Sequence, residues 1–131
     1  MSGVGWLVIA GAFALVAGQF WLLYRSRAVQ GWSAPDFSRL RPDGVDAEWW
    51  LLYFHHPGCP HCRQQTPLLE ELAAEDPRVL LVDTHQEPEL AAAFRVRVTP
   101  TIMRVHDGTI DRVLVGQQSR RRLRRLLETR R

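Results

Sequence analysis

The chain has 131 residues, of which 46% are hydrophobic and 24% are charged, and its net charge is +3. A chain of this length supports one small hydrophobic core, which excludes a multidomain architecture. Its two cysteines, Cys59 and Cys62, are too close together to tie distant loops into a disulfide framework.

The first predicted element is an apolar helix from Val4 to Tyr24. This stretch has no charged residue and one amide, Gln19, and it matches the roughly 20 residues that cross a bilayer core. Trp6 near one end and Tyr24 at the other suit the two membrane interfaces. A cleaved signal peptide would begin with basic residues, whereas the first basic residue here is Arg25. We therefore predict a single transmembrane anchor over residues 1–25.

The charges that follow this helix bear on its orientation. Arg25, Arg27, Arg39 and Arg41 all come after the apolar stretch, and basic residues are retained on the cytoplasmic side of a membrane. The charge bias therefore predicts a cytoplasmic placement for the rest of the chain.

A polar linker is expected over residues 26–35, followed by one domain over residues 36–131. Its first strong element is an apolar strand from Trp49 to His55. The helix that follows has leucines 68, 69 and 72 at helical spacing, and Pro67 is expected to kink it.

The remaining elements alternate and then end in a hairpin and a helix. We predict a strand over Arg78–Thr84, a short helix over Pro88–Phe94, two strands over Thr101–His106 and Thr109–Val115, and a last helix over Ser119–Thr129. Asp107 and Gly108 favour a tight turn between the paired strands. Ser119 is a candidate cap for the last helix, whose leucines share one face among arginines. The pattern indicates an α/β fold.

Several motifs together carry a family resemblance. A Cys-x-x-Cys follows the first long strand, and Val-Thr-Pro-Thr at residues 98–101 precedes the hairpin. With Pro67, Pro100, Gly108 and Gly116 at matching positions, the chain resembles the thioredoxin family from about Phe37 onward. The resemblance implies a thioredoxin-like fold, a central mixed β-sheet flanked by helices, here preceded by the transmembrane helix.

The same resemblance implies thiol:disulfide exchange. Cys59 would lie at the N-terminal end of a helix, where the unpaired N–H groups and the macrodipole favour a thiolate. It would attack a disulfide, and the buried Cys62 would resolve the mixed disulfide by forming the Cys59–Cys62 bond. The implied partners are protein thiol or disulfide substrates and a redox partner protein, with no cofactor, metal or nucleic acid.

Three local departures from ordinary thioredoxins are expected to tune this chemistry. Pro60 and His61 between the cysteines give a DsbA-like dipeptide, and an imidazole beside the thiolate favours the reduced state and hence a more oxidising disulfide. Tyr53 stands where thioredoxins keep a buried carboxylate that helps to deprotonate the resolving cysteine. Gly58 stands where they have a tryptophan. The direction of exchange stays open.

Pro100 is expected to follow a cis peptide bond, which costs an X-Pro bond only about 0.5–1 kcal/mol. The resemblance implies that this proline lies against the dithiol and obstructs metal capture. It also implies that the backbone of Thr99 is exposed for pairing with a bound substrate.

Two alternatives stay open at this point. His55, His56 and His61 crowd the cysteines, so the segment could instead carry copper or zinc for delivery or assembly. The arginine-rich end, which has seven of the 17 basic residues, could be a solvated helix face or could contact anionic lipid.

The expected location is a bacterial inner membrane, with one membrane-spanning segment. Charge bias favours a cytoplasmic domain, whereas anchored proteins resembling this one work in the periplasm, where oxidised thiols persist.

Overall fold

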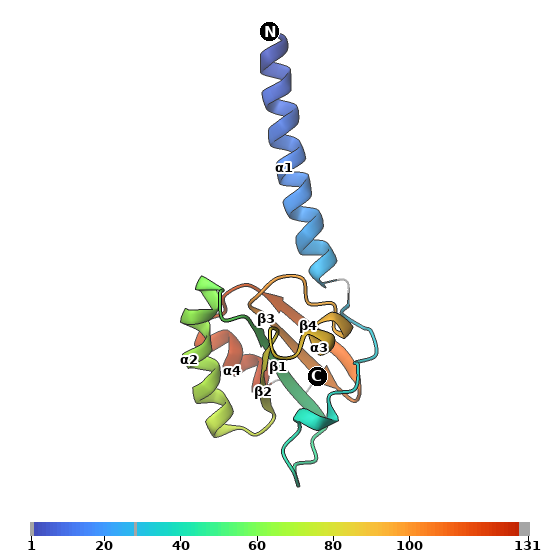
Figure 1. The fold of residues 1–131 in the computed structure, drawn as a ribbon, viewed down its shortest axis with the longest axis vertical. Coiled ribbons are helices and arrows are strands. Elements are labelled where there is room, and N and C mark those ends of the chain that lie inside the picture. The colour runs from blue at the N-terminus through green and yellow to red at the C-terminus, as the bar shows by residue number, and fades with distance from the viewer. Residues whose placement is uncertain (1, 28, 129–131) are drawn as a thin grey trace.

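The computed structural model describes residues 2–27 and 29–128. The elements in chain order are α1 (Gly3–Arg27), the 3-10 turn η1 (Ser38–Leu40), β1 (Trp49–His55), α2 (Pro60–Glu75), β2 (Val79–Asp83), α3 (Pro88–Ala93), β3 (Thr101–His106), β4 (Thr109–Val115) and α4 (Arg120–Glu128) (Figure 1). Every predicted helix and strand is present. The predicted last residue of the final helix, Thr129, lies outside the described residues.

The four strands form one mixed sheet in the order β2-β1-β3-β4. β1 pairs in parallel with β2 and antiparallel with β3, and β3 pairs antiparallel with β4. The interior position of β1 explains its continuous apolar sequence, because a strand covered on both faces has no solvent side to alternate toward. This confirms the thioredoxin-like α/β fold.

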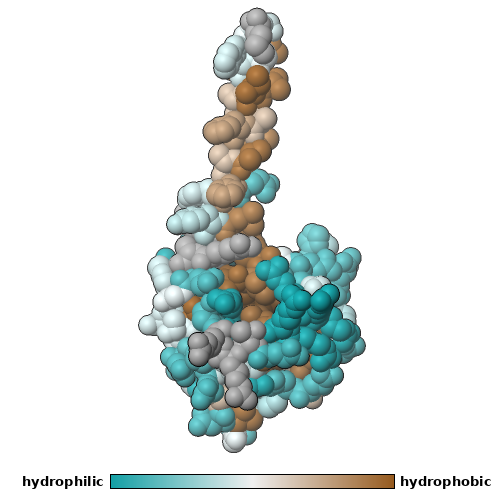
Figure 2. Space-filling model, turned by 180° about the vertical axis from the view of Figure 1, so that it is seen from behind, coloured by the Kyte–Doolittle hydropathy of each residue, from teal (hydrophilic) through white to brown (hydrophobic). Residues whose placement is uncertain are grey.

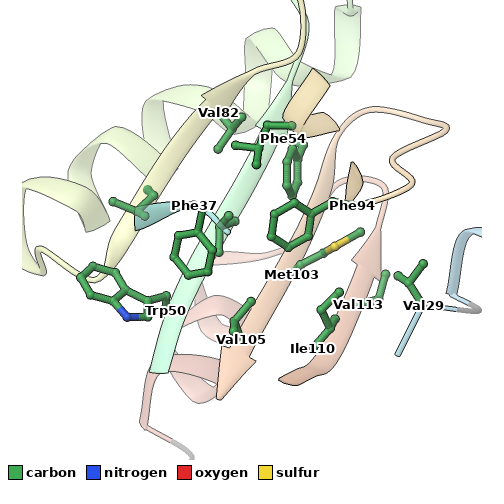
Figure 3. Packing of buried hydrophobic residues seen from close by; sticks show 13 residues of the cluster. Val29, Phe37, Trp50, Phe54, Val82, Phe94, Met103, Val105, Ile110 and Val113 are labelled. Carbon is green, nitrogen blue, oxygen red and sulfur yellow. The ribbon is translucent and has the colours of Figure 1, made fainter. Parts of the chain in front are cut away.

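Each face of the sheet has its own hydrophobic core. Alternate β1 residues such as Trp50 and Phe54 pack with Phe37 and Phe94 on the α3 face (Figure 3). The intervening residues pack under α2 and α4 on the other face, through Leu69, Leu72, Leu123 and Leu126. Two layers of helix therefore enclose the sheet and hold the start of α2 at the end of β1.

The β3–β4 hairpin turns at the predicted dipeptide. Asp107 and Gly108 have φ values of 48° and 76°, and positive φ at both central residues is the type I′ pattern that matches strand twist. Glycine adopts this conformation without a Cβ penalty. The turn chemistry in the sequence therefore fixes the hairpin register.

A buried ion pair fastens β4 and α4. Arg104 on β3 is 1% exposed, and its guanidinium bonds both carboxylate oxygens of Asp111 and donates to the Leu126 carbonyl at 3.0 Å. The register shifts between Arg104 and Val105, where Asp111 is the extra β4 residue. This bulge turns the carboxylate onto the face of the sheet that carries Arg104.

Part of the expected linker packs against the sheet. Val29 is 3% exposed and belongs to the core on the α3 face. The next residues pair with β4: Gly31 N–H donates to the Ile110 carbonyl at 2.6 Å, and Ile110 N–H donates to the Trp32 carbonyl at 2.9 Å. An antiparallel bridge joins Ser33 to Thr109. This segment therefore covers the otherwise open edge of β4.

Helix α1 projects away from the domain (Figure 1). Its Gly3–Tyr24 portion has 22 residues with a mean hydropathy of 1.9, and none of it is buried in the molecule. Apolar surface runs along α1, whereas much of the domain surface is hydrophilic (Figure 2). The helix has the length and composition of a membrane span, although signal sequences near an N-terminus share these properties.

Candidate active site

Cys59 is the N-cap of α2. Its φ and ψ of −89° and 116° are extended, and its Sγ accepts the Cys62 N–H at 3.2 Å. Pro60 takes the first helical position, where a missing N–H costs nothing because that group has no helical partner. The sequence Cys-Pro-His-Cys thus starts the helix with a sulfur as the capping acceptor.

The two thiols are free and differ in access. Cys59 is partly exposed, whereas Cys62 is buried, at 3% exposure. A partner disulfide can therefore reach the first sulfur, while the second, one helical turn further on, is placed to attack from inside.

Hydrogen bonding separates the two thiol pKa values. Burial acts to raise the pKa of Cys59, but hydrogen bonding with Cys62, with Thr99 and with the backbone of His61 outweighs it and brings the pKa below its usual value. Burial, together with the hydrogen bond to Cys59, raises the pKa of Cys62. The exposed thiol therefore ionises first, at the positive end of the helix dipole.

The loop before β3 completes the site. The Thr99–Pro100 peptide bond is cis, as expected, and Pro100 is buried. The Cys59 thiol lies 3.5 Å from the Thr99 carbonyl. The structure therefore brings Thr99 and Pro100 together with the dithiol from a distance of about 40 residues along the chain.

Tyr53 lies beneath the dithiol on β1. Its hydroxyl lies 3.0 Å from the Thr66 Oγ1 and donates to the Cys62 carbonyl at 3.4 Å. Burial raises the pKa of Tyr53 to about 12. The phenol therefore stays protonated at neutral pH and cannot replace a carboxylate as a proton acceptor.

A cavity of about 380 Å³ opens beside the buried thiol. It is lined by Cys62 and by the neighbouring side chains His55, His56, Pro57, Arg63, Thr66, Pro67, Glu70 and Asp83. The His55 ring stacks on Tyr53 with a centroid distance of 5.3 Å. Burial lowers the pKa of His55 and outweighs the negative charges of Asp83 and Glu70, which act to raise it. The imidazole is therefore neutral at pH 7.

The other two histidines of the motif, His56 and His61, lie at the surface. His56 accepts the Gly58 N–H at 3.0 Å and lies edge-on to His85, 6.0 Å between ring centroids. His61 is exposed. The sequence placed His85 on the surface, which is correct, but did not predict its contact with His56.

Over residues 2–27 and 29–128, no three His, Cys, Asp or Glu side chains converge in a way that could hold a metal ion. The metal-carrier alternative therefore has a dithiol but no third protein ligand in this part of the chain.

One buried polar residue near the site was missed from sequence. Gln65 on α2 is 1% exposed, and its side-chain carbonyl accepts the Gln118 N–H. This bond ties α2 to the segment before α4. Nothing in a helical Gln-Gln pair indicates which glutamine faces inward until the packing of the helix is known.

Comparison with known proteins supports the same fold. Residues 43–129 match the family model for thioredoxin. The chain is 38% identical over 65 residues to a thioredoxin 2 of Streptomyces coelicolor, covering 48% of each protein. It is 32% identical over 69 residues to thioredoxin 1 of Synechococcus elongatus, covering 50% of this chain and 64% of that one. The chain thus spans about half to under two thirds of these two relatives.

A solved structure gives the same result. A thioredoxin variant from Halobacterium salinarum superposes with a TM-score of 0.61 at 28% identity, covering 72% of this chain and 85% of that one. Because the family model spans well over half of the sequence and includes the dithiol, the chain belongs to the thioredoxin family, with Cys59 and Cys62 as its Cys-x-x-Cys pair.

Proposed function

We propose that this protein exchanges disulfides with protein substrates, with Cys59 as nucleophile and Cys62 as resolving thiol, while α1 holds it in a membrane. The observation that carries the exchange chemistry is the capping bond from Cys62 N–H to the Cys59 sulfur at 3.2 Å. A thiol that accepts this capping bond lies at the positive end of the helix dipole, which favours its ionisation to the nucleophilic thiolate.

The exchange proceeds in two substitutions at sulfur. The Cys59 thiolate attacks a substrate disulfide, forms a mixed disulfide and releases one substrate thiolate. The Cys62 thiolate then attacks the Cys59 sulfur, forms the Cys59–Cys62 bond and releases the second substrate thiol. Two electrons pass from the dithiol to the substrate, and the reverse sequence oxidises a substrate dithiol.

The second step requires Cys62 to lose a proton in spite of its raised pKa. Tyr53 is protonated and cannot accept it. The neutral His55, which lines the same cavity as Cys62, is the group proposed to accept it, directly or through water in the cavity. His55 thus takes the place of the buried carboxylate that thioredoxins have at the position of Tyr53.

The residues around the dithiol are proposed to set potential and substrate fit. Pro60 and His61 occupy the exposed first turn of α2, where the His61 imidazole beside Cys59 would favour the thiolate and make the disulfide more oxidising. Thr99 and Pro100 are proposed to line the substrate groove, with the Thr99 backbone pairing with the substrate chain.

The exchange is tested on the full chain in detergent. The Cys62→Ser variant should accumulate a mixed disulfide with a disulfide-containing peptide, because attack is retained and resolution is lost. Cys59→Ser should trap nothing. Equal trapping by both variants, or by neither, would contradict the assigned roles.

The membrane anchor rests on α1. Its Gly3–Tyr24 portion of 22 residues rises about 33 Å at 1.5 Å per residue, close to the roughly 30 Å bilayer core. Retention of the chain in carbonate-washed membranes tests the anchor, and release into the wash would contradict it. The arginines that follow the apolar stretch favour a cytoplasmic domain. Labelling of Cys59 by a membrane-impermeant thiol reagent in intact cells would instead establish the opposite side.

A further inference from the structure

The end of the sheet that carries the dithiol is also the end at which the anchor enters the domain. The segment over residues 29–34 runs antiparallel to β4, since Ala34 bonds Gly108 and Gly31 bonds Ile110. Its earlier residues therefore lie toward the far end of β4, and Val29 packs in one core with Val113. That far end is Val115.

The strand register shows that this end of β4 lies at the same end of the sheet as the active site. Val115 lies opposite Thr101, and Thr101 lies opposite Phe54. Thr101 follows the cis-proline directly, and Phe54 is five residues before Cys59. Figure 1 shows the same arrangement, with the base of α1 and the N-terminal end of α2 on one side of the domain and the loop before β1 on the other.

The connection between anchor and domain is short. α1 ends at Arg27, and Val29 is already buried in the core, so one residue separates them. Two Cα–Cα steps span at most about 7.6 Å. The domain therefore cannot turn its dithiol end far from the bilayer while α1 spans it.

The width of the sheet sets the lateral reach. Three strand spacings separate the segment beside β4 from β1, which is about 14 Å at 4.8 Å per spacing. β1, which leads directly into the dithiol, therefore lies only about 14 Å to the side of the segment that carries α1.

We propose that the dithiol faces the membrane and acts on disulfides or thiols that membrane proteins present close to the bilayer surface. This inference rests on the proposed anchor and exchange activity. A substrate chain must enter the space between the Thr99 loop and the headgroups, which a juxtamembrane segment does readily. The bilayer obstructs the same approach for a large soluble protein.

The orientation is tested with fluorophores at the two ends of the domain. One variant keeps only Cys59, through Cys62→Ser. Its matched control lacks both native cysteines and carries Asp43→Cys in the exposed loop before β1, at the opposite end. In vesicles with a headgroup-attached quencher, the label at residue 59 should be quenched several-fold more strongly. Equal quenching, or stronger quenching at residue 43, would overturn the proposal.

The substrate class is tested with two transmembrane reporter peptides in the same vesicles as the reduced full chain. One carries its disulfide a few residues outside the bilayer, and the other carries it beyond a helical spacer of about 30 residues, or about 45 Å. The near reporter should be reduced at least about tenfold faster, because effective concentration collapses when a tether cannot span two sites. Insertion of a flexible segment of about 20 residues after Arg27 should reduce the difference between the two reporters.

Failure of this inference can be distinguished from failure of the proposed function. A soluble disulfide peptide assayed with the detergent-extracted chain reports the exchange chemistry, and carbonate extraction reports the anchor. Equal rates for the two reporters, with both of these controls positive, would overturn the membrane-facing site alone. Loss of either control would remove the basis on which the inference rests.

Discussion

Helices α2 and α4 both begin with a hydrogen bond from a backbone N–H to the side chain of the N-cap residue, but the bond has a different consequence in each helix. In α4, the Ser119 Oγ accepts the Arg122 N–H at 3.2 Å. In α2, the Cys59 Sγ accepts the Cys62 N–H at the same distance. Both bonds satisfy an N–H group that the helix leaves unpaired. The hydroxyl does not ionise at neutral pH, so its cap contributes only stability, whereas the thiol ionises and its cap makes a nucleophile.

The surroundings of the two helix starts extend this contrast. The first turn of α4 holds Arg120, Arg121 and Arg122, which the positive end of the helix dipole disfavours. That helix is held instead by its leucines and by Arg104, which donates to the Leu126 carbonyl near its other end. The first turn of α2 lies beside Thr99 and an open cavity. α4 is therefore held in place by packing and hydrogen bonds along its length, whereas α2 keeps its N-cap residue, Cys59, accessible.

The largest expected effect on the exchange rate comes from replacing the N-cap cysteine of α2 by serine, the N-cap residue of α4. In Cys59→Ser, an oxygen still caps α2, so the free energy of unfolding should change by less than about 1 kcal/mol. Disulfide exchange should fall to background, because no nucleophile remains. Chemical denaturation and a peptide-disulfide assay measure the two quantities. Disulfide exchange that persists in Cys59→Ser would contradict the role of Cys59 as the nucleophile.

The next largest effect is expected on stability, at the Arg104–Asp111 ion pair that helps to hold α4. Asp111→Ala removes the carboxylate that bonds the buried Arg104 guanidinium, and we expect a loss of about 3 kcal/mol in the free energy of unfolding, as for other broken buried pairs. The exchange rate per folded molecule should not change. Arg112→Met, at the exposed neighbouring position, is the matched control and should cost less than about 0.5 kcal/mol. A large change in exchange rate would show that the two regions are coupled.

A third variant tests whether His55 accepts the proton of Cys62. His55→Phe keeps a ring against Tyr53 but removes the proton acceptor, and resolution of the mixed disulfide should slow about tenfold. Because burial lowers the pKa of His55, the native advantage should be present at neutral pH and should disappear as the pH falls through that pKa. Stopped-flow fluorescence of the second step measures it. His85→Phe, which lies outside the cavity, should leave the rate unchanged.

The smallest effect is expected at the serine cap. Ser119→Ala should lower the free energy of unfolding by about 1 kcal/mol and should leave the reactivity of Cys59 unaltered. Thermal unfolding and alkylation kinetics test the two halves of this prediction. A shift in Cys59 reactivity would mean that α4 tunes the site through Gln118 and Gln65, which join the two helices.

The local elements were predictable because each has its signal in adjacent residues. The apolar run at residues 49–55, the Asp107–Gly108 turn and the Ser119 cap were predicted and are confirmed. The cis bond before Pro100 was likewise expected from the Val-Thr-Pro-Thr motif. The first three follow from residue type and hydrophobic pattern, and the cis bond follows from the family resemblance.

What the sequence did not reveal depends on contacts between distant residues. The ion pair of Arg104 needs the bulge that turns Asp111 to the same face, and alternation along a regular strand would not predict it. The pairing of residues 31–34 with β4 depends on the open edge of a sheet whose strand order is a tertiary property. The contact of His56 with His85 likewise requires β1 and β2 to be neighbours.

The most direct test of the central claim is the pH dependence of thiol alkylation in the Cys62→Ser chain, with free cysteine as the reference. The hydrogen bonds and the helix terminus at Cys59 predict a rate that reaches half its maximum clearly below the reference pKa of about 8.5. The Cys59→Ser chain, in which only the buried Cys62 remains, should titrate above that value. Coincident profiles for the two thiols, both at the ordinary value, would contradict the account.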